Sequence, residues 1–143
     1  MDIQAYIDVD WASCPNDRRS TSGYCIFIGP NLVSWSSTKQ KIVSRSSAES
    51  EYRGLAVAAF EIAWIQSLLT ELCLSPTIPP ILWCDNQSAT HLAANPVFHT
   101  QTKHIELDLH FIRDKVLQNQ LHIQYLPSSD QIANIFTKHI SSS

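Results

Sequence analysis

The sequence of 143 residues lacks the features that mark several large classes of protein. With only three glycines, and with 44% hydrophobic against 16% charged residues, it has the composition of an ordinary folded domain rather than a disordered chain. No stretch reaches the about 18 consecutive apolar residues that a membrane-spanning helix needs, so we expect no membrane association. The length suits one hydrophobic core, which predicts a single domain over residues 1–143 with a disordered tail at 140–143.

The cysteines are few, and they are not paired in the sequence. No two of them have the C-x-x-C spacing that supplies zinc ligands in pairs, and no amino-terminal apolar run marks the chain for secretion. We therefore expect reduced thiols in an intracellular protein. The four cysteines are Cys14, Cys25, Cys73 and Cys84.

The chain also has no excess of positive charge, since its formal net charge is −3. This value alone argues against a nucleic-acid-binding protein, but the placement of the charges matters more than their sum. Carboxylates that hold a metal ion would not repel a phosphate, so the net charge does not decide the question. Basic residues gather in the first third of the chain, at Arg18, Arg19, Lys39, Lys41, Arg45 and Arg53.

Hydrophobic periodicity predicts a mixture of strands and helices. The first three strands are expected to form an antiparallel meander, with residues 42–43 as a candidate extension. The fourth strand should follow a helical crossover and run parallel to the first. This predicts an α/β fold with a five-stranded mixed sheet flanked by helices. The predicted strands are 3–9, 21–28, 32–37, 81–84 and 121–126, and the predicted helices are 46–72, 85–94, 105–117 and 131–138.

Two glutamates near the start of the long helix have different explanations. Ser46 and Glu49 have the spacing of a capping box, in which the serine caps the helix and the glutamate reaches back to the backbone of the serine. Glu51 has no such role and adjoins the predicted buried stripe. A carboxylate at that position is costly unless it is paired or binds a metal, although an ion pair with Arg53 remains an alternative.

Other acids fall at the ends of predicted strands. Asp8 and Asp10 lie at the end of the first strand, and Asp85 directly follows the short apolar strand 81–84. Asp85 alone would be explained as the N-cap of the next helix. Together with Glu51, however, acids delivered by three distant segments indicate a site for divalent cations, which prefer oxygen ligands.

Several motifs, in order along nearly the whole chain, resemble the ribonuclease H domain that closes the polyprotein of copia-type retrotransposons. The resemblance implies the ribonuclease H fold, and it places a reverse transcriptase domain upstream. The motifs are DVDWA at 8–12, RSTSGY at 19–24, SWSS at 34–37, SSAESEY at 46–52, WCDN at 83–86, TKHIE at 102–106 and DQIANIFTK at 130–138.

The resemblance also implies the roles of individual residues. It makes Asp8, Glu51 and Asp85 the ligands of two Mg²⁺ ions, for which Mn²⁺ could substitute, and Asp10 is the alternative to Asp8. Asn134 stands where the family has an aspartate, its fourth active-site carboxylate. Asn134 keeps a carbonyl oxygen but loses the charge that attracts a hard cation. Asp130, one helical turn earlier, is a candidate substitute.

The implied function is hydrolysis of the RNA strand of RNA–DNA hybrids during reverse transcription, in the cytoplasm within a virus-like particle or in the nucleus. The alternative is a catalytically impaired relic that binds nucleic acid or protein partners without robust turnover. Contacts to the hybrid are expected to be to its backbone and its 2′-hydroxyls, although the paired arginines are also explained as a solvated surface. The residues expected to make these contacts are Arg18, Arg19, Ser22, Lys39, Asn86 and Gln87, with Lys41 and Arg45 as further candidates.

Overall fold

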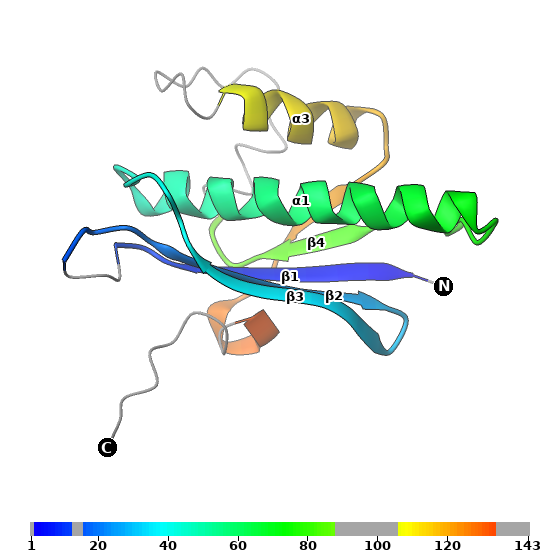
Figure 1. Ribbon diagram of the computed structural model, residues 1–143, viewed down its shortest axis with the longest axis horizontal. Helices are drawn as coiled ribbons and strands as arrows, with labels where there is room; N and C mark the ends of the chain where they lie inside the picture. Colours follow the sequence, from blue (N-terminus) through cyan, green and yellow to red (C-terminus); the bar gives the residue numbers. More distant parts are fainter. Residues whose placement is uncertain (1, 13–15, 88–105, 134–143) are drawn as a thin grey trace.

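The computed structural model describes residues 2–12, 16–87 and 106–133, which form a five-stranded sheet with helices on one face (Figure 1). The sheet has the order β3-β2-β1-β4-β5. The elements along the chain are β1 (Ile3–Asp10), β2 (Thr21–Ile28), β3 (Asn31–Lys39), α1 (Ser47–Glu71), β4 (Ile81–Cys84), α3 (Glu106–Leu117), β5 (His122–Tyr125) and the 3-10 turn η2 (Ser128–Asp130).

The pairing of the strands confirms the predicted mixed sheet. β1 and β2 are antiparallel, as are β2 and β3, so the first three strands form the expected meander. α1 then carries the chain back across the sheet, and β4 pairs parallel to β1 on its other side. β5 extends the sheet in parallel to β4. The carboxyl-terminal ends of β1 and β4 therefore meet at the same edge of the sheet.

The core lies between the sheet and the inner face of α1. Side chains at alternate positions of β1 (Ile3, Ala5 and Ile7) point toward this layer and are almost completely buried. They meet a stripe of α1 that recurs at helical spacing, as the apolar pattern predicts. The buried residues of this stripe include Tyr52, Leu55, Ala59 and Ile62.

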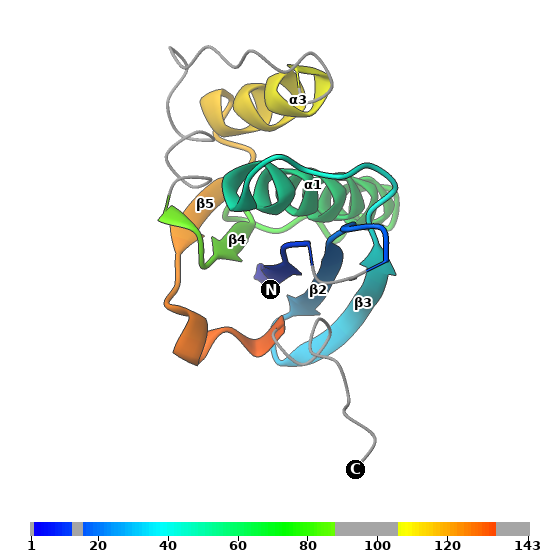
Figure 2. The same ribbon diagram turned by 90° about the vertical axis from the view of Figure 1, so that its left-hand side faces the viewer.

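α3 forms an outer layer against α1, and η2 lies on the other side of the sheet (Figure 2). The contact between the two helices includes Phe60 of α1 and Phe111 of α3, whose rings stack with centroids 4.1 Å apart and planes 16° apart. Offset stacking of this kind adds stability beyond the area that the rings bury. In the described part of the chain, no helix is long and apolar enough to span a membrane.

Several expectations about local structure need correction. Residues 42–43 do not extend the sheet, because β3 ends at Lys39 and a bend leads to the cap of α1. Ser46 caps the helix as predicted, accepting a hydrogen bond from the backbone N–H of Glu49 at 3.1 Å. The Glu49 carboxylate, however, accepts from the N–H of Arg45 and from the side chain of Arg53, rather than from the N–H of Ser46. Gln131 separates η2 from the helical turn that begins at Ile132, and most of the predicted helices 85–94 and 131–138 lies outside the described residues.

α1 approaches β1 closely at Gly54, and this contact generates a prediction. A Cβ added at Gly54 would lie 2.7 Å from Cγ2 of Val9. Gly54→Ala should therefore destabilise the protein by about 1–2 kcal/mol, because overpacking outweighs the gain of about 1 kcal/mol in helix propensity. Urea unfolding measures this change.

The double variant Val9→Ala/Gly54→Ala is the matched control, because it removes the methyl group that the new Cβ would meet. It should lose less stability than the sum of the two single variants. A Gly54→Ala protein as stable as the wild type would contradict the close approach.

Candidate active site

Three donor groups converge where β4 ends beneath the first turns of α1. Glu51 lies on the buried side of α1, Cys84 is the last residue of β4, and Asp85 follows it in a bend. One donor atom from each of these three residues lies within 4.8 Å of the other two. Glu51 is only 4% exposed, as its place beside the buried stripe predicted, whereas Asp85 is half-buried and reaches the surface.

The electrostatics of this group are those of an acid buried beside other acids. Burial raises the pKa of Glu51, and the charge of Asp85, a hydrogen bond with Asp85 and the charge of Asp8 raise it further, to about 10. The Cys84 thiol donates a hydrogen bond to Oε1 of Glu51 at 3.6 Å, which works in the opposite direction. Among the described residues, no lysine or arginine forms an ion pair with Glu51 or Asp85.

Asp8 lies nearby but outside this tight group. The charge of Asp8 contributes to the raised pKa of Glu51. Its carboxylate oxygens, however, do not belong to the described group of donor atoms that lie within 4.8 Å of one another. The side chains of Ile7 and Val9 reach toward α1 at Gly54, so strand alternation puts Asp8 and Asp10 on the opposite face of β1. The structure thus brings Glu51 and Asp85 together, with Asp8 at longer range.

Two polar side chains that the sequence analysis did not single out hold this edge in place. Gln40 donates from its amide to Oγ of Ser22 at 2.7 Å and to the backbone carbonyl of Ser50 at 2.9 Å, which ties β2 to the turn of α1 that carries Glu51. Ser128 of η2 donates to Oδ2 of Asp85 at 3.0 Å. Both contacts join residues distant in sequence, and no local motif indicates them.

Comparison with known proteins places these residues in a family. The chain is 48% identical over 141 residues, 99% of its length, to each of the retrovirus-related Pol polyproteins of the Arabidopsis thaliana transposons RE1 and RE2. It is 32% identical over 136 residues, 95% of its length, to the corresponding polyprotein of transposon TNT 1-94 from Nicotiana tabacum. The chain spans about a tenth of the length of these relatives. No model of a known protein family matches it.

Solved structures show which fold the chain has. LC11-RNase H1, isolated from compost, has a TM-score of 0.68 and 15% identity, with 94% of this chain and 91% of that chain covered. Prototype foamy virus protease-reverse transcriptase has a TM-score of 0.61 and 14% identity, with 95% of this chain and 20% of that chain covered. The chain belongs to the ribonuclease H-like domains of transposon Pol polyproteins. The resemblance carried by its motifs is confirmed.

The expected nucleic-acid-binding residues of this ribonuclease H-like domain occupy two places. Asn86 and Gln87 follow Asp85 at the carboxylate edge, where Asn86 is half-buried and Gln87 is exposed. Gln87 has a helical backbone, and Asn86 rather than Asp85 directly precedes it. Arg19 and Lys39 both pair with Oδ2 of Asp17, at 2.9 Å and 2.6 Å.

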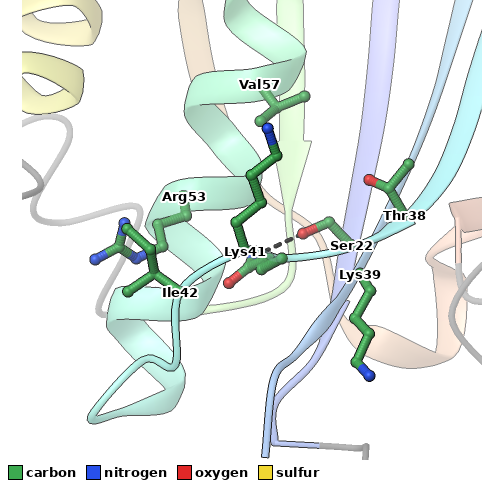
Figure 3. Close-up of a pocket in the computed structure, with 8 residues that line it drawn as sticks. Ser22, Thr38, Lys39, Lys41, Ile42, Arg53 and Val57 are labelled. Carbon is green, nitrogen blue, oxygen red and sulfur yellow. Dashed lines mark hydrogen bonds between the residues drawn. The ribbon is translucent and has the colours of Figure 1, made fainter. Parts of the chain in front are cut away.

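The other expected contacts include one buried residue. Arg18 is exposed, whereas Ser22 is buried beneath Gln40. Ser22 borders a pocket of about 490 Å³ beside α1 that Arg53 and Lys41 also line. The side chain of Lys41 extends toward Val57, whereas that of Lys39 points the opposite way (Figure 3).

Asn134 and Asp130 are the two candidates for the fourth position of the active site. Asn134 lies outside the described residues. Asp130 is exposed at the end of η2 and does not belong to the group formed by Glu51, Cys84 and Asp85.

The burial of Glu51 predicts how the stability of the ribonuclease H-like domain changes with pH when divalent cations are chelated. The pKa of Glu51 is raised from 4.5 to about 10, so folding favours the protonated acid. Its contribution is fully present below about pH 4.5 and is lost as the pH rises toward 10. Relative to Glu51→Gln, the wild type should lose up to about 1.4 kcal/mol of unfolding free energy per pH unit in this window.

Denaturant unfolding at a series of pH values measures this difference in unfolding free energy. Other groups titrate alike in both proteins, so their contributions cancel in the difference. Glu71→Gln, at an exposed position of the same helix, is the control and should show no such slope. A difference between the wild type and Glu51→Gln that stays constant between about pH 5 and 9 would contradict the buried, protonated acid.

Proposed function

We propose that this domain hydrolyses the RNA strand of RNA–DNA hybrids with divalent cations, as part of reverse transcription. The observation that carries the proposal is the meeting of Glu51 and Asp85 at an edge of a ribonuclease H-like sheet, within the electrostatic reach of Asp8. LC11-RNase H1 has also been solved in complex with an RNA/DNA hybrid, and that structure has a TM-score of 0.66 with this chain. The relatives named as Pol polyproteins support a place beside a reverse transcriptase.

The donor set fits Mg²⁺ or Mn²⁺. Carboxylate oxygens are the ligands that these hard cations prefer, and the buried Glu51 carboxylate is held beside Asp85 without an ion pair to any described lysine or arginine. Asp8, Glu51 and Asp85 would hold two ions, and Asp10 is the alternative to Asp8. Two bound ions can supply an activated water and stabilise the charge of the leaving 3′-oxygen.

Other side chains would orient the carboxylates and contact the hybrid. Ser128 orients the Asp85 carboxylate by its hydrogen bond, and Gln40 holds the turn of α1 that carries Glu51. Asn86 and Gln87, which follow Asp85 in the sequence, would contact the sugar–phosphate backbone of the hybrid near the metal ions. Arg18, Arg19 and Lys39 would then meet the phosphates farther along the hybrid.

A catalytically impaired domain is the second candidate, and Asn134 is the observation that favours it. Without the aspartate that the family resemblance leads one to expect there, the centre has one negative charge fewer with which to attract cations. This form would keep the fold and bind hybrid or a protein partner without robust turnover.

Asp85→Asn tests the proposed centre. Removing the charge of Asp85 should reduce Mg²⁺-dependent cleavage of labelled RNA in a hybrid on the order of 100-fold or more. Salt-sensitive binding of the hybrid should persist, which separates a lost metal site from a lost fold. Asp114→Asn, which changes an exposed acid of α3, is the matched control. Cleavage unaffected by Asp85→Asn would rule out this assignment.

Asn134→Asp separates the active enzyme from the impaired relic. Restoring the carboxylate should strengthen cation binding and raise the cleavage rate at low Mg²⁺ about tenfold or more, if the missing charge limits turnover. A wild type with no detectable cleavage and an active Asn134→Asp variant would establish the relic. Equal rates in both proteins would show that the domain does not need this charge.

A further inference from the structure

The proposed reaction makes no use of the sulfur atom that lies inside its carboxylate centre. Sγ of Cys84 is 3.6 Å from Oε1 of Glu51 and is completely buried. It belongs to the same group of donor atoms, all within 4.8 Å of one another, as the oxygens of Glu51 and Asp85. Mg²⁺ and Mn²⁺ favour oxygen over sulfur, so the thiol has no place in their coordination.

We propose that Cys84, Glu51 and Asp85 form a second, mixed sulfur and oxygen site that binds Zn²⁺ and related thiophilic cations in competition with Mg²⁺. Thiolate and carboxylate groups are both ordinary zinc ligands. The three residues supply three donors, and water completes the four-coordinate shell that Zn²⁺ prefers.

The separation of one donor pair, Sγ of Cys84 and Oε1 of Glu51, suits a tetrahedral ion. With Zn–S bonds of about 2.3 Å and Zn–O bonds of about 2.1 Å, a tetrahedral angle separates sulfur from oxygen by about 3.6 Å. The observed distance from Sγ of Cys84 to Oε1 of Glu51 is 3.6 Å. This pair can therefore bind Zn²⁺ without changing its spacing.

Both backbone groups of Asn86 also contact Sγ of Cys84. The N–H of Asn86 points at Sγ, with nitrogen and sulfur 3.5 Å apart. The backbone carbonyl oxygen of Asn86 lies 3.6 Å from Sγ and is an acceptor for the thiol. When Zn²⁺ binds, the S–H bond breaks, a Zn–S bond forms, and the proton passes to solvent.

The other described cysteines lack these surroundings and provide internal controls. Cys25 is buried in β2, where burial raises the pKa of its thiol to about 11. Cys73 is exposed after the end of α1. Neither belongs to a group of three metal-binding side chains among the residues that the structure describes.

Cadmium, a thiophilic relative of zinc, tests the site by a spectroscopic signal that does not depend on cleavage. Titrating the metal-free, reduced protein with Cd²⁺ should produce the ultraviolet cadmium–thiolate charge-transfer band. Cys84→Ser and Cys84→Ala should abolish this band, and Cys25→Ser and Cys73→Ser should leave it. A band absent from the wild type, or unchanged in Cys84→Ser and Cys84→Ala, would overturn the proposal.

Calorimetry with Zn²⁺ adds a second measurement and a variant that keeps the cysteine. Loss of a residue that only supports a metal ligand typically lowers metal affinity roughly 10- to 100-fold. Because Asp85 would bind the ion directly, Asp85→Asn should weaken Zn²⁺ binding by at least this factor. Circular dichroism checks that each variant is folded. Unchanged Zn²⁺ affinity in a folded Asp85→Asn protein would also overturn the proposed ligand set.

Inhibition of the nuclease by Zn²⁺ would be the regulatory consequence of this site, and this part of the inference rests on the proposed function. The binding of Zn²⁺ at Cys84 does not rest on it. Zn²⁺ should inhibit Mg²⁺-dependent cleavage, and Cys84→Ala should relieve this inhibition at least about tenfold. A cadmium band that needs Cys84 in a protein without cleavage activity would support the sulfur site and contradict only the nuclease. Cleavage in a protein without the band would do the reverse.

Discussion

The structure of the site depends on one costly interaction, the burial of the Glu51 carboxylate against Asp85. A buried acid beside two others is destabilised when charged, which is why the pKa of Glu51 is raised to about 10. A bound cation reverses this balance, because it makes the charged form the favourable one. The fold thus holds Glu51 where its charged form is unfavourable, and the proposed cation would compensate this cost.

The fold positions these groups through the direction of its strands. Because β4 runs parallel to β1, both strands finish at the same edge, and α1 begins above that edge. The absence of a Cβ at Gly54 lets α1 settle onto Val9, one residue from Asp8. The helix therefore delivers Glu51 at a depth that a larger residue at position 54 would not allow.

The sequence predicted those parts of the fold and site that depend on periodic or local patterns. The positions of the strands, though not all of their limits, the cap at Ser46 and the burial of Glu51 follow from alternation, helical spacing and capping chemistry. The true partner of Glu49, the bridge made by Gln40 and the contact from Ser128 to Asp85 were not predicted. These contacts depend on how loops and strand ends meet after folding, and 43 residues separate Ser128 from Asp85.

The end of β4 explains how the adjacent residues Cys84 and Asp85 can both lie close to Glu51. In a continuing strand, Cys84 and Asp85 would point to opposite faces, as Leu82 and Trp83 do when Leu82 is buried in the core and Trp83 stacks on Tyr6. The strand instead stops at Cys84, and Asp85 lies in a bend. Alternation ends there, so the thiol from the core side and the carboxylate from the open side converge on Glu51. One more residue of strand would separate the sulfur from the oxygens, so the length of β4 would determine whether the proposed metal centre includes a sulfur ligand.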